Sequence, residues 1–153
     1  MSELYEKSLL KLELDQVLEL LAGCAGSQGG KEACLRLHPT SDLEDVNLML
    51  EQTTAASDLC TRKGNPVFGD VTDVSASLER AERGGSLQPK ELLRIAGILR
   101  CTRTIKGYVS EDEKATVLDS FFQALTPNKY LEDRIFGAIL SEEEIADNAS
   151  PEL

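Results

Sequence analysis

The segment from Ser86 to Val109, SLQPKELLRIAGILRCTRTIKGYV, limits the fold more than any other part of this chain. Pro89 suits the first turn of a helix, and no further proline interrupts the segment. Two adjacent stripes recur at three- and four-residue spacing, one of Leu92, Ile95, Leu99 and Thr102 and one of Ile98, Ile105 and Val109. The pattern predicts a single helix of about twenty residues whose apolar side needs other elements packed against it.

Start and stop signals elsewhere in the chain predict further helices. Capping residues, namely Asp15, Ser27 and either Ser41 or Asp42, precede apolar positions at helical spacing. The expected helices span residues 15–24, 27–37, 41 or 42 to 62, 72–83, 114–125 and 128–140. Because no window alternates apolar and polar residues convincingly, we expect no sheet. The sequence therefore predicts an all-α fold, one domain of about seven helices over residues 1–153.

The composition is that of a soluble globular protein. With 153 residues, 41% of them hydrophobic and 28% charged, the chain is long enough to bury a core and too apolar to be disordered. It has no apolar run of membrane-spanning length and no basic leader, which favours the cytoplasm. Its cysteines, at positions 24, 34, 60 and 101, lack a C-x-x-C pair. Three of them lie in helical patterns, so we expect buried, reduced thiols and no zinc site.

The stretch AGSQGGKE, residues 25–32, has the glycines and lysine of a phosphate-binding loop. That motif needs a glycine where Ala25 stands and a magnesium-binding hydroxyl where Glu32 stands, and it should follow a buried strand. Here a helical pattern precedes it. We therefore expect Ser27 to cap a helix, Gly29 and Gly30 to permit close approach of a neighbouring element, and nucleotide to bind elsewhere.

No residues suggest catalysis or metal binding. His38 is the one histidine, lies in a connector before a proline, and has no nucleophilic partner in any motif. The acidic run at residues 141–144 lacks the alternating spacing of a calcium loop. We expect no catalytic, cofactor-binding or metal-ligating residue in this chain.

The net charge of −11 argues against nucleic acid as a partner of the whole surface, but residues 80–106 carry seven basic side chains against two acidic ones. Two interpretations stay open. The favoured one is a solvated face that balances acidic neighbours. The other is a weak contact with nucleic acid through Arg94, Arg100, Arg103 and Lys106. The last three are spaced by three residues, so they fall within about a third of the helix circumference, turned partly away from the Leu92, Ile95 and Leu99 stripe.

The C-terminal residues NASPEL resemble the beginning of a helix. Ser150 suits the N-cap, Pro151 the first helical position and Glu152 the first turn. We therefore expect the chain to be a piece of a longer protein, cut where a following helix begins.

Five short motifs resemble, in order, the N-terminal region of the second bacterial MutS paralogue, a family of MutS-like endonucleases and recombination suppressors. The matching stretches are SQGGKEACLRLHPTSDLEDVNLMLEQT, DVTDVSASLERAERGGSLQPKELLRIAGILR and DNASPEL. They contain a Gly-Lys helix, a Pro and Asp-Leu-Glu entry to a long helix, an LxRAExGG stop, a Pro-x-Glu-Leu-Leu helix and an ASPEL exit. The resemblance spans essentially the whole chain.

This resemblance implies a fold and a role. The chain would be the helical core, or lever-base, domain of a longer protein, called the parent below, and a non-catalytic structural and coupling domain within it. The parent would bind ATP and magnesium in a later ATPase domain and carry a C-terminal nuclease domain. Its expected partners are its own remaining domains, DNA or the ribosome, and a second copy in a homodimer, with no membrane. Its expected roles are suppression of recombination, processing of branched DNA or rescue of stalled ribosomes.

One alternative to this reading stays open. A stand-alone helical adaptor that binds a partner helix in a groove would also be all-α and acidic.

Overall fold

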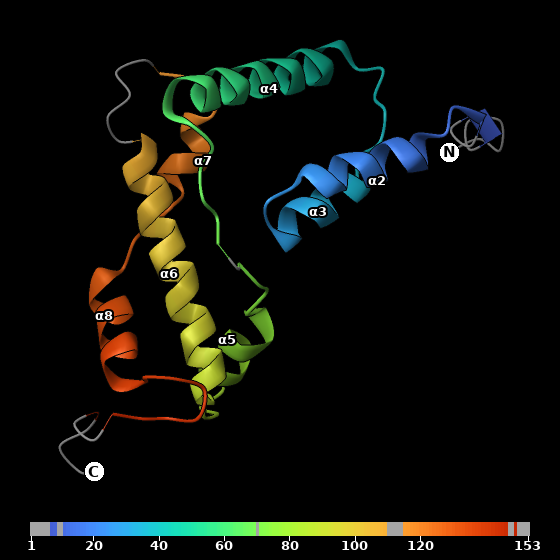
Figure 1. Cartoon of the computed structure of the whole chain (residues 1–153). Coiled ribbons are helices and arrows are strands. Elements are labelled where there is room, and N and C mark those ends of the chain that lie inside the picture. The colour runs from blue at the N-terminus through green and yellow to red at the C-terminus, as the bar shows by residue number, and fades with distance from the viewer. Residues whose placement is uncertain (1–6, 9–10, 70, 110–114, 147–148, 150–153) are drawn as a thin grey trace.

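The computed structural model describes residues 7–8, 11–69, 71–109, 115–146 and 149 (Figure 1). In this part of the chain the regular elements are helices, apart from one isolated antiparallel bridge between Ile139 and Ile145. The helices are α2 (Leu14–Cys24), α3 (Gln28–Leu35), α4 (Leu43–Lys63), α5 (Ser75–Glu82), α6 (Pro89–Val109), α7 (Asp119–Gln123) and α8 (Lys129–Ala138). The predicted all-α fold of about seven helices is confirmed.

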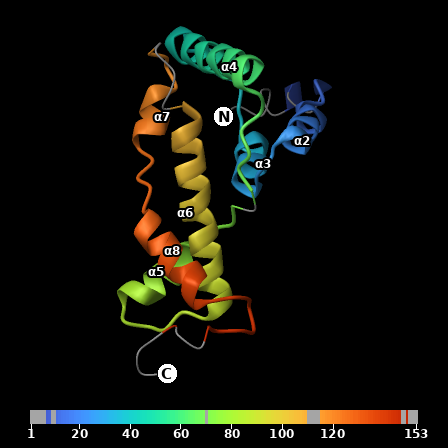
Figure 2. The ribbon, with the colours of Figure 1, turned by 60° about the vertical axis from the view of Figure 1, so that its left-hand side comes forward.

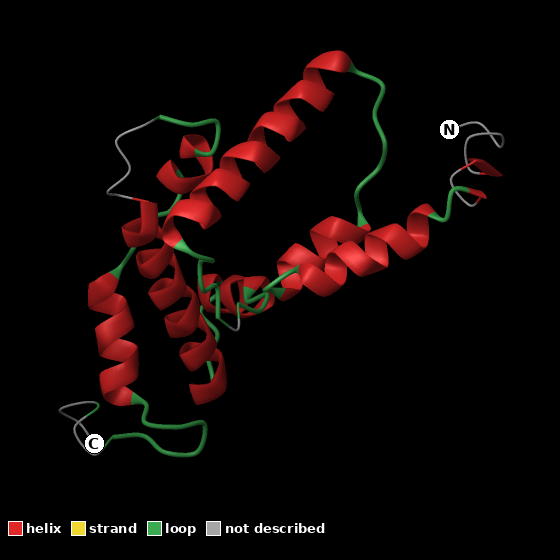
Figure 3. Cartoon of the chain, turned by 45° about the horizontal axis from the view of Figure 1, so that its top comes forward, coloured by secondary structure: helices red, strands yellow, loops and turns green. Residues whose placement is uncertain are grey.

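The helices form an open arrangement around α6. Helix α8 packs along α6, and α7 lies at the C-terminal end of α6, where α4 crosses (Figures 1 and 2). Helices α2 and α3 pack on each other as a hairpin, which lies to the side of the α6–α8 pair (Figure 3). The long helix predicted within residues 86–109 is therefore present as α6, the element on which the others are placed.

The hydrophobic core lies between α6 and α8 and is small. Ala96, Ile135 and Ile139 are its buried members, and the partly buried side chains around them are Leu92, Leu93, Ile95, Phe136 and Ala138. The chain exposes 11607 Å², against roughly 7600 Å² for a compact monomer of 16.7 kDa. Of the described residues of α4, only Leu59 is buried. Much apolar surface on α2, α3 and α4 therefore lacks a cover in this chain.

Local capping chemistry fixes several helix ends where the sequence predicts them. The backbone N–H of Gly30 donates to Ser27 Oγ at 3.1 Å, and that of Leu131 donates to Asn128 Oδ1 at 3.0 Å. Asp42 Oδ1 accepts from the backbone N–H groups of Glu44 and Asp45, at 2.9 and 3.1 Å. These bonds satisfy amide groups that a helix leaves unpaired in its first turn.

The paired glycines after α5 form a Schellman ending. The N–H of Gly85 donates to the carbonyl of Arg80, and that of Gly84 to the carbonyl of Ala81, both at 2.9 Å. Gly84 has a φ of 80°, a left-handed conformation that glycine adopts without strain. The LxRAExGG motif is thus a helix stop, as predicted.

Three helix starts differ from the prediction. Helix α2 begins at Leu14, so Asp15 lies in its first turn and is not the cap. Helix α5 begins at Ser75 and not at residue 72, because the Asp73 carboxylate accepts the N–H of Ser75 and holds the preceding residues in a turn. Helix α7 is only Asp119–Gln123, because the Asp119 carboxylate accepts the N–H and hydroxyl of Thr116. Residue 114, the predicted start, lies outside the described residues.

The expectation about the cysteines was wrong, and that about the glycines was wrong at Gly29. Cys24 is exposed and the other three cysteines are only half-buried, because the open arrangement leaves these helix faces uncovered. A Cβ at Gly29 would meet no atom within 4 Å, so this glycine admits no neighbouring element. One at Gly30 would lie 3.1 Å from Ser27 Oγ of its own cap and 3.4 Å from Ala25 Cβ at the end of α2, so the expected close approach holds at Gly30 alone.

Among the described residues, no helix is long and apolar enough to cross a membrane. The helix start predicted from NASPEL falls at residues 150–153, outside the described part of the chain.

Candidate functional site on helix α6

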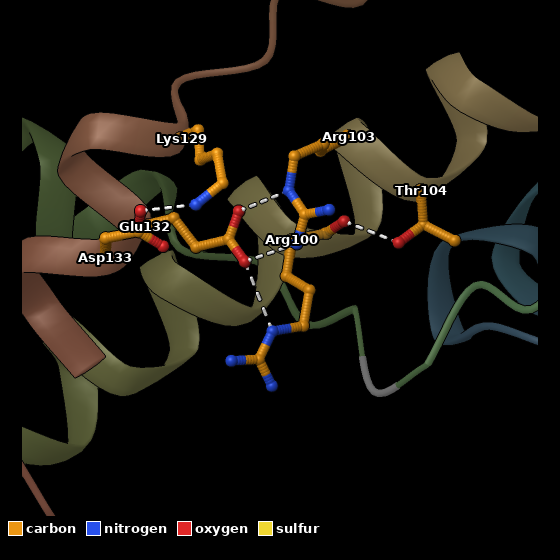
Figure 4. Close-up of polar contacts among 6 residues, drawn as sticks. All are labelled: Arg100, Arg103, Thr104, Lys129, Glu132 and Asp133. Carbon is orange, nitrogen blue, oxygen red and sulfur yellow. Dashed lines mark hydrogen bonds and ion pairs between the residues drawn. The ribbon is translucent and has the colours of Figure 1, made fainter. Parts of the chain in front are cut away.

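Arg100 and Arg103 of α6 both bind Glu132 of α8 (Figure 4). Arg103 donates from Nε to Glu132 Oε2 at 2.9 Å and from a terminal nitrogen to Oε1 at 2.8 Å. Arg100 Nε donates to the same Oε1 at 3.3 Å. One carboxylate thus joins two turns of α6 to α8. We call these three residues the Glu132 cluster.

Glu132 is buried, with 2% of its surface exposed. Hydrogen bonding by Arg103, followed by that of Arg100 and the positive charge of both, lowers the pKa of Glu132 to about 2, against the opposing effect of burial. The same contacts raise the pKa of Arg103. The cluster is therefore ionised at neutral pH, and its buried charge is compensated.

The Arg100 guanidinium also lies 3.9 Å from the centroid of the Phe136 ring, a cation–π contact. Arg100 and Arg103 were expected to turn partly away from the stripe of Leu92, Ile95 and Leu99. They face α8 instead, the helix on which Leu92 and Ile95 also pack. The reason is that a carboxylate on α8 and an aromatic ring beside it compensate the two charges at the edge of the core.

Lys106 is bound separately from the Glu132 cluster. Its ammonium donates to the carbonyl oxygen of Phe122 at 2.7 Å, in the last turn of α7, and this carbonyl also accepts the backbone N–H of Leu125 at 3.2 Å. A positive charge at this position also favours the negative end of the helix dipole. Lys106 thus joins α6 to α7, as the Glu132 cluster joins α6 to α8.

The N-terminal part of the basic segment is ion-paired as well. Lys90 binds Glu142 at 2.7 Å, and Arg80 of α5 binds Glu91 of α6. Glu91 also accepts from the Ser77 hydroxyl at 2.7 Å and from the backbone N–H of Gln88 at 2.9 Å. The bond from Gln88, with smaller contributions from Ser77 and Arg80, lowers the pKa of Glu91 to about 2. Glu91 therefore both caps α6 and holds α5 against it.

Arg94 differs from these residues. Its side chain is exposed and has no polar partner within the described part of the chain. It lines a groove of about 430 Å³ between α6 and residues 67–69 of the connector that follows α4. The four predicted contact residues, all on α6, therefore have different surroundings. Arg100 and Arg103 bind Glu132 of α8, Lys106 binds the end of α7, and Arg94 lines the groove together with Arg100.

Sequence reasoning missed Glu132, the residue that organises this site. The available signal was the spacing of this carboxylate, three residues before Ile135 and four before Phe136, which places a charge on the apolar side of α8. Within the described residues, no group of three His, Cys, Asp or Glu side chains could hold a metal ion.

Together these features define an all-helical domain in which polar and ionic contacts from one long helix place its neighbours. Curated proteins from three bacteria illustrate what the chain is similar to, and each is named endonuclease MutS2. The protein of Ruminiclostridium cellulolyticum is 42% identical over 151 residues, that of Acetivibrio thermocellus 41% over 152, and that of Clostridium beijerinckii 36% over 151. Each match covers 97% of this chain and 19% of the relative. No protein-family model matches.

The chain is thus homologous to a segment of the MutS2 family. It spans 19% of the length of these relatives, so what the whole proteins do is a separate question from what this segment does.

Proposed function

We propose that this segment is a non-catalytic structural and coupling domain of a MutS-like, DNA- or ribosome-associated ATPase and endonuclease. The observation that carries the proposal is the Glu132 cluster, which fixes the placement of α8 on α6 in a chain homologous to one segment of larger endonucleases. Coupling two distant sites requires a part that moves without changing shape. Close packing and specific charge pairs are the means of holding such a shape.

The chemistry would reside in the rest of the parent. ATP and magnesium would bind in its ATPase domain, cleavage would occur in its nuclease domain, and this segment would transmit the movement between parts. Its partners would be those remaining domains and, through the parent, DNA or the ribosome, with the parent a homodimer in the cytoplasm. The processes served would be suppression of recombination, processing of branched DNA or rescue of stalled ribosomes.

Direct contact with nucleic acid by this segment would be weak. Arg94, Arg100, Arg103 and Lys106 are the side chains that could meet phosphate. Arg100 and Arg103 already share a carboxylate, which partly neutralises their positive charge. Lys106 keeps its charge but donates to a backbone carbonyl, which occupies one of its donor groups. With a net charge of −11, long-range repulsion opposes binding further.

The experiment compares Glu132→Gln with Asp133→Asn in the parent protein. Asp133 is the matched control because it is exposed and its ion pair lies along its own helix, with Lys129 at 2.5 Å. We expect Glu132→Gln to leave ATP hydrolysis near its normal rate and to reduce the effect of ATP on DNA cleavage. Asp133→Asn should change neither. An ATP effect as large in Glu132→Gln as in the unmodified protein would overturn the coupling role, and so would ATP hydrolysis or DNA cleavage by the 153-residue chain alone.

A further inference from the structure

The groove that contains Arg94 has two walls from separate parts of the chain. One wall is a face of α6, and the other is the connector at residues 67–69. The α6 residues that line it recur at three- and four-residue spacing: Lys90, Leu93, Arg94, Gly97, Arg100, Cys101 and Thr104. Glu142, which pairs with Lys90, lines it as well. From residue 90 to 104 the face extends about 21 Å along the helix, at 1.5 Å per residue. The groove therefore has the length and direction of a short segment lying along α6.

The groove has apolar side chains on its connector wall and a glycine, Gly97, on its α6 wall. Val67 is 72% exposed and Phe68 42% exposed, both on the connector wall. On the α6 wall, a Cβ at Gly97 would meet no atom within 4 Å. Small side chains on a helix allow the backbone of another helix to approach closely, and the apolar walls would gain from being covered.

The charges of the groove favour an acidic occupant. Lys90 is already paired with Glu142, and Arg100 with Glu132, so the charge of Arg94 is the uncompensated one among the described lining residues. A carboxylate placed opposite Arg94 would form an ion pair beside apolar surface, where water screens it less than in the open. An apolar groove with a single free cation is also poorly suited to a nucleic acid, which needs several phosphate contacts.

We propose that an amphipathic helix from the remaining part of the parent, with a carboxylate opposite Arg94, occupies this groove. The proposal rests on the proposed function, in which this segment is one part of a larger chain. The length favours this occupant, because the segment accounts for only 19% of the relatives and leaves about four fifths of their length outside it. A second copy of the segment is less favourable, since two surfaces of net charge −11 repel each other.

Cys101 provides a native probe, because its half-buried thiol lines the groove. The experiment measures the rate at which N-ethylmaleimide modifies Cys101, read by peptide mass spectrometry, in the 153-residue chain and in the parent. We expect modification to be slower in the parent by about tenfold, because the bound helix must open first. Equal rates in the two proteins would overturn the proposal. Circular dichroism of both proteins confirms that they are folded.

Arg94→Glu identifies the occupant by its charge. In the parent it should raise the Cys101 rate by about threefold through loss of an ion pair, while Arg36→Glu, an exposed arginine outside the groove, should not. Protection that is unchanged by Arg94→Glu would overturn the acidic occupant. If Cys101 of the isolated chain becomes protected as the chain concentration rises, the groove belongs to a second copy. If its protection requires added duplex DNA, the groove belongs to nucleic acid.

This experiment can fail separately from the proposed function. If Cys101 is unprotected in the parent but Glu132→Gln reduces the effect of ATP on DNA cleavage, the groove proposal alone is contradicted. If Cys101 is protected in the parent but Glu132→Gln leaves the effect of ATP on DNA cleavage unchanged, the coupling role is contradicted and the docked helix is supported.

Discussion

Lys63 and Tyr108 join the two longest helices at their C-terminal ends. The Lys63 ammonium, on the last residue of α4, donates to the backbone carbonyl of Tyr108 in α6 at 2.9 Å. The Tyr108 hydroxyl donates in the opposite direction, to the carbonyl of Gly64 at 2.6 Å, and lies 3.3 Å from that of Leu59. Because α4 buries little of its own surface, these polar contacts are a main determinant of its direction.

Tyr108→Phe should therefore loosen α4. Loss of the hydroxyl leaves the Gly64 carbonyl without this donor, and we expect the free energy of unfolding to fall by about 1 kcal/mol. Urea denaturation measures the change, and hydrogen exchange should show faster exchange in the last turns of α4. Tyr130→Phe is the control, because Tyr130 is 71% exposed and only accepts from Arg134, at 3.3 Å. Equal losses in the two variants would contradict this role of Tyr108.

Glu132→Gln should destabilise the chain far more than Asp133→Asn. Removing the buried charge leaves two guanidinium groups without their shared carboxylate, which we expect to cost on the order of 2 kcal/mol. Asp133→Asn loses an exposed pair and should cost less than about 0.5 kcal/mol. Thermal and urea unfolding of the purified chain measure both values. A Glu132→Gln chain as stable as the unmodified one would show that apolar contacts alone hold α8 on α6.

Acid should weaken the chain in a defined pH window. The pKa of Glu132 and that of Glu91 are both lowered from 4.5 to about 2 in the folded protein. The unfolded chain therefore takes up protons first, so the stabilisation is complete above pH 4.5 and is lost as the pH falls toward 2. Chemical denaturation across this range should show a steeper loss in the unmodified chain than in Glu132→Gln with Glu91→Gln. Glu143→Gln, an exposed change in the turn after α8, should leave the slope as it is.

Gly85→Ala should destabilise the turn between α5 and α6. A Cβ there would lie 2.6 Å from Arg80 Cγ and 2.9 Å from the Arg80 carbonyl oxygen, so the backbone must shift at a cost of about 1 to 3 kcal/mol. Gly107→Ala is the matched control within α6, where a Cβ meets nothing within 4 Å. That change should stabilise by about 0.5 kcal/mol through helix propensity. The two melting temperatures should thus move in opposite directions, and a shared direction would contradict the prediction.

The 153-residue chain should bind duplex and branched DNA weakly and with steep salt dependence. Three or so phosphate contacts give a slope near −3 for log affinity against log salt. Fluorescence anisotropy at two salt concentrations measures it, with Arg94→Glu expected to weaken binding and Arg36→Glu expected to weaken it less. Arg100→Glu with Arg103→Glu is the less direct test, because it also breaks the Glu132 cluster. Submicromolar binding that survives the higher salt would show a dedicated nucleic-acid interface.

The order of the helices was predictable because their capping hydrogen bonds join residues that are close in sequence. Ser27, Asp42 and Asn128 each bond to an amide two or three residues away, so the sequence around them contains both partners. The stop at Gly84 and Gly85 is local in the same sense. The starts of α5 and α7 were wrong because Asp73 and Asp119 form short-range side-chain turns that compete with helix.

The candidate site was less predictable because its contacts are distant in sequence. Glu132 lies 29 residues from Arg103 and 32 from Arg100, and no local pattern joins them. Helical spacing placed the two arginines on one face correctly, but it could not show that α8 covers that face. The burial of the cysteines was overestimated for the same reason, since periodicity identifies an apolar side of a helix without showing whether anything packs there.

The small core between α6 and α8 has a consequence for how this chain melts. The heat capacity of unfolding grows with the apolar surface that becomes wet, and a compact domain of 153 residues would show about 2 kcal/mol/K. With Ala96, Ile135 and Ile139 as the buried cluster, the value for this chain should be well below that. Its stability curve is then shallow, with little cold sensitivity and a broad calorimetric transition. The same helices should melt sharply only in a protein that covers α2, α3 and α4.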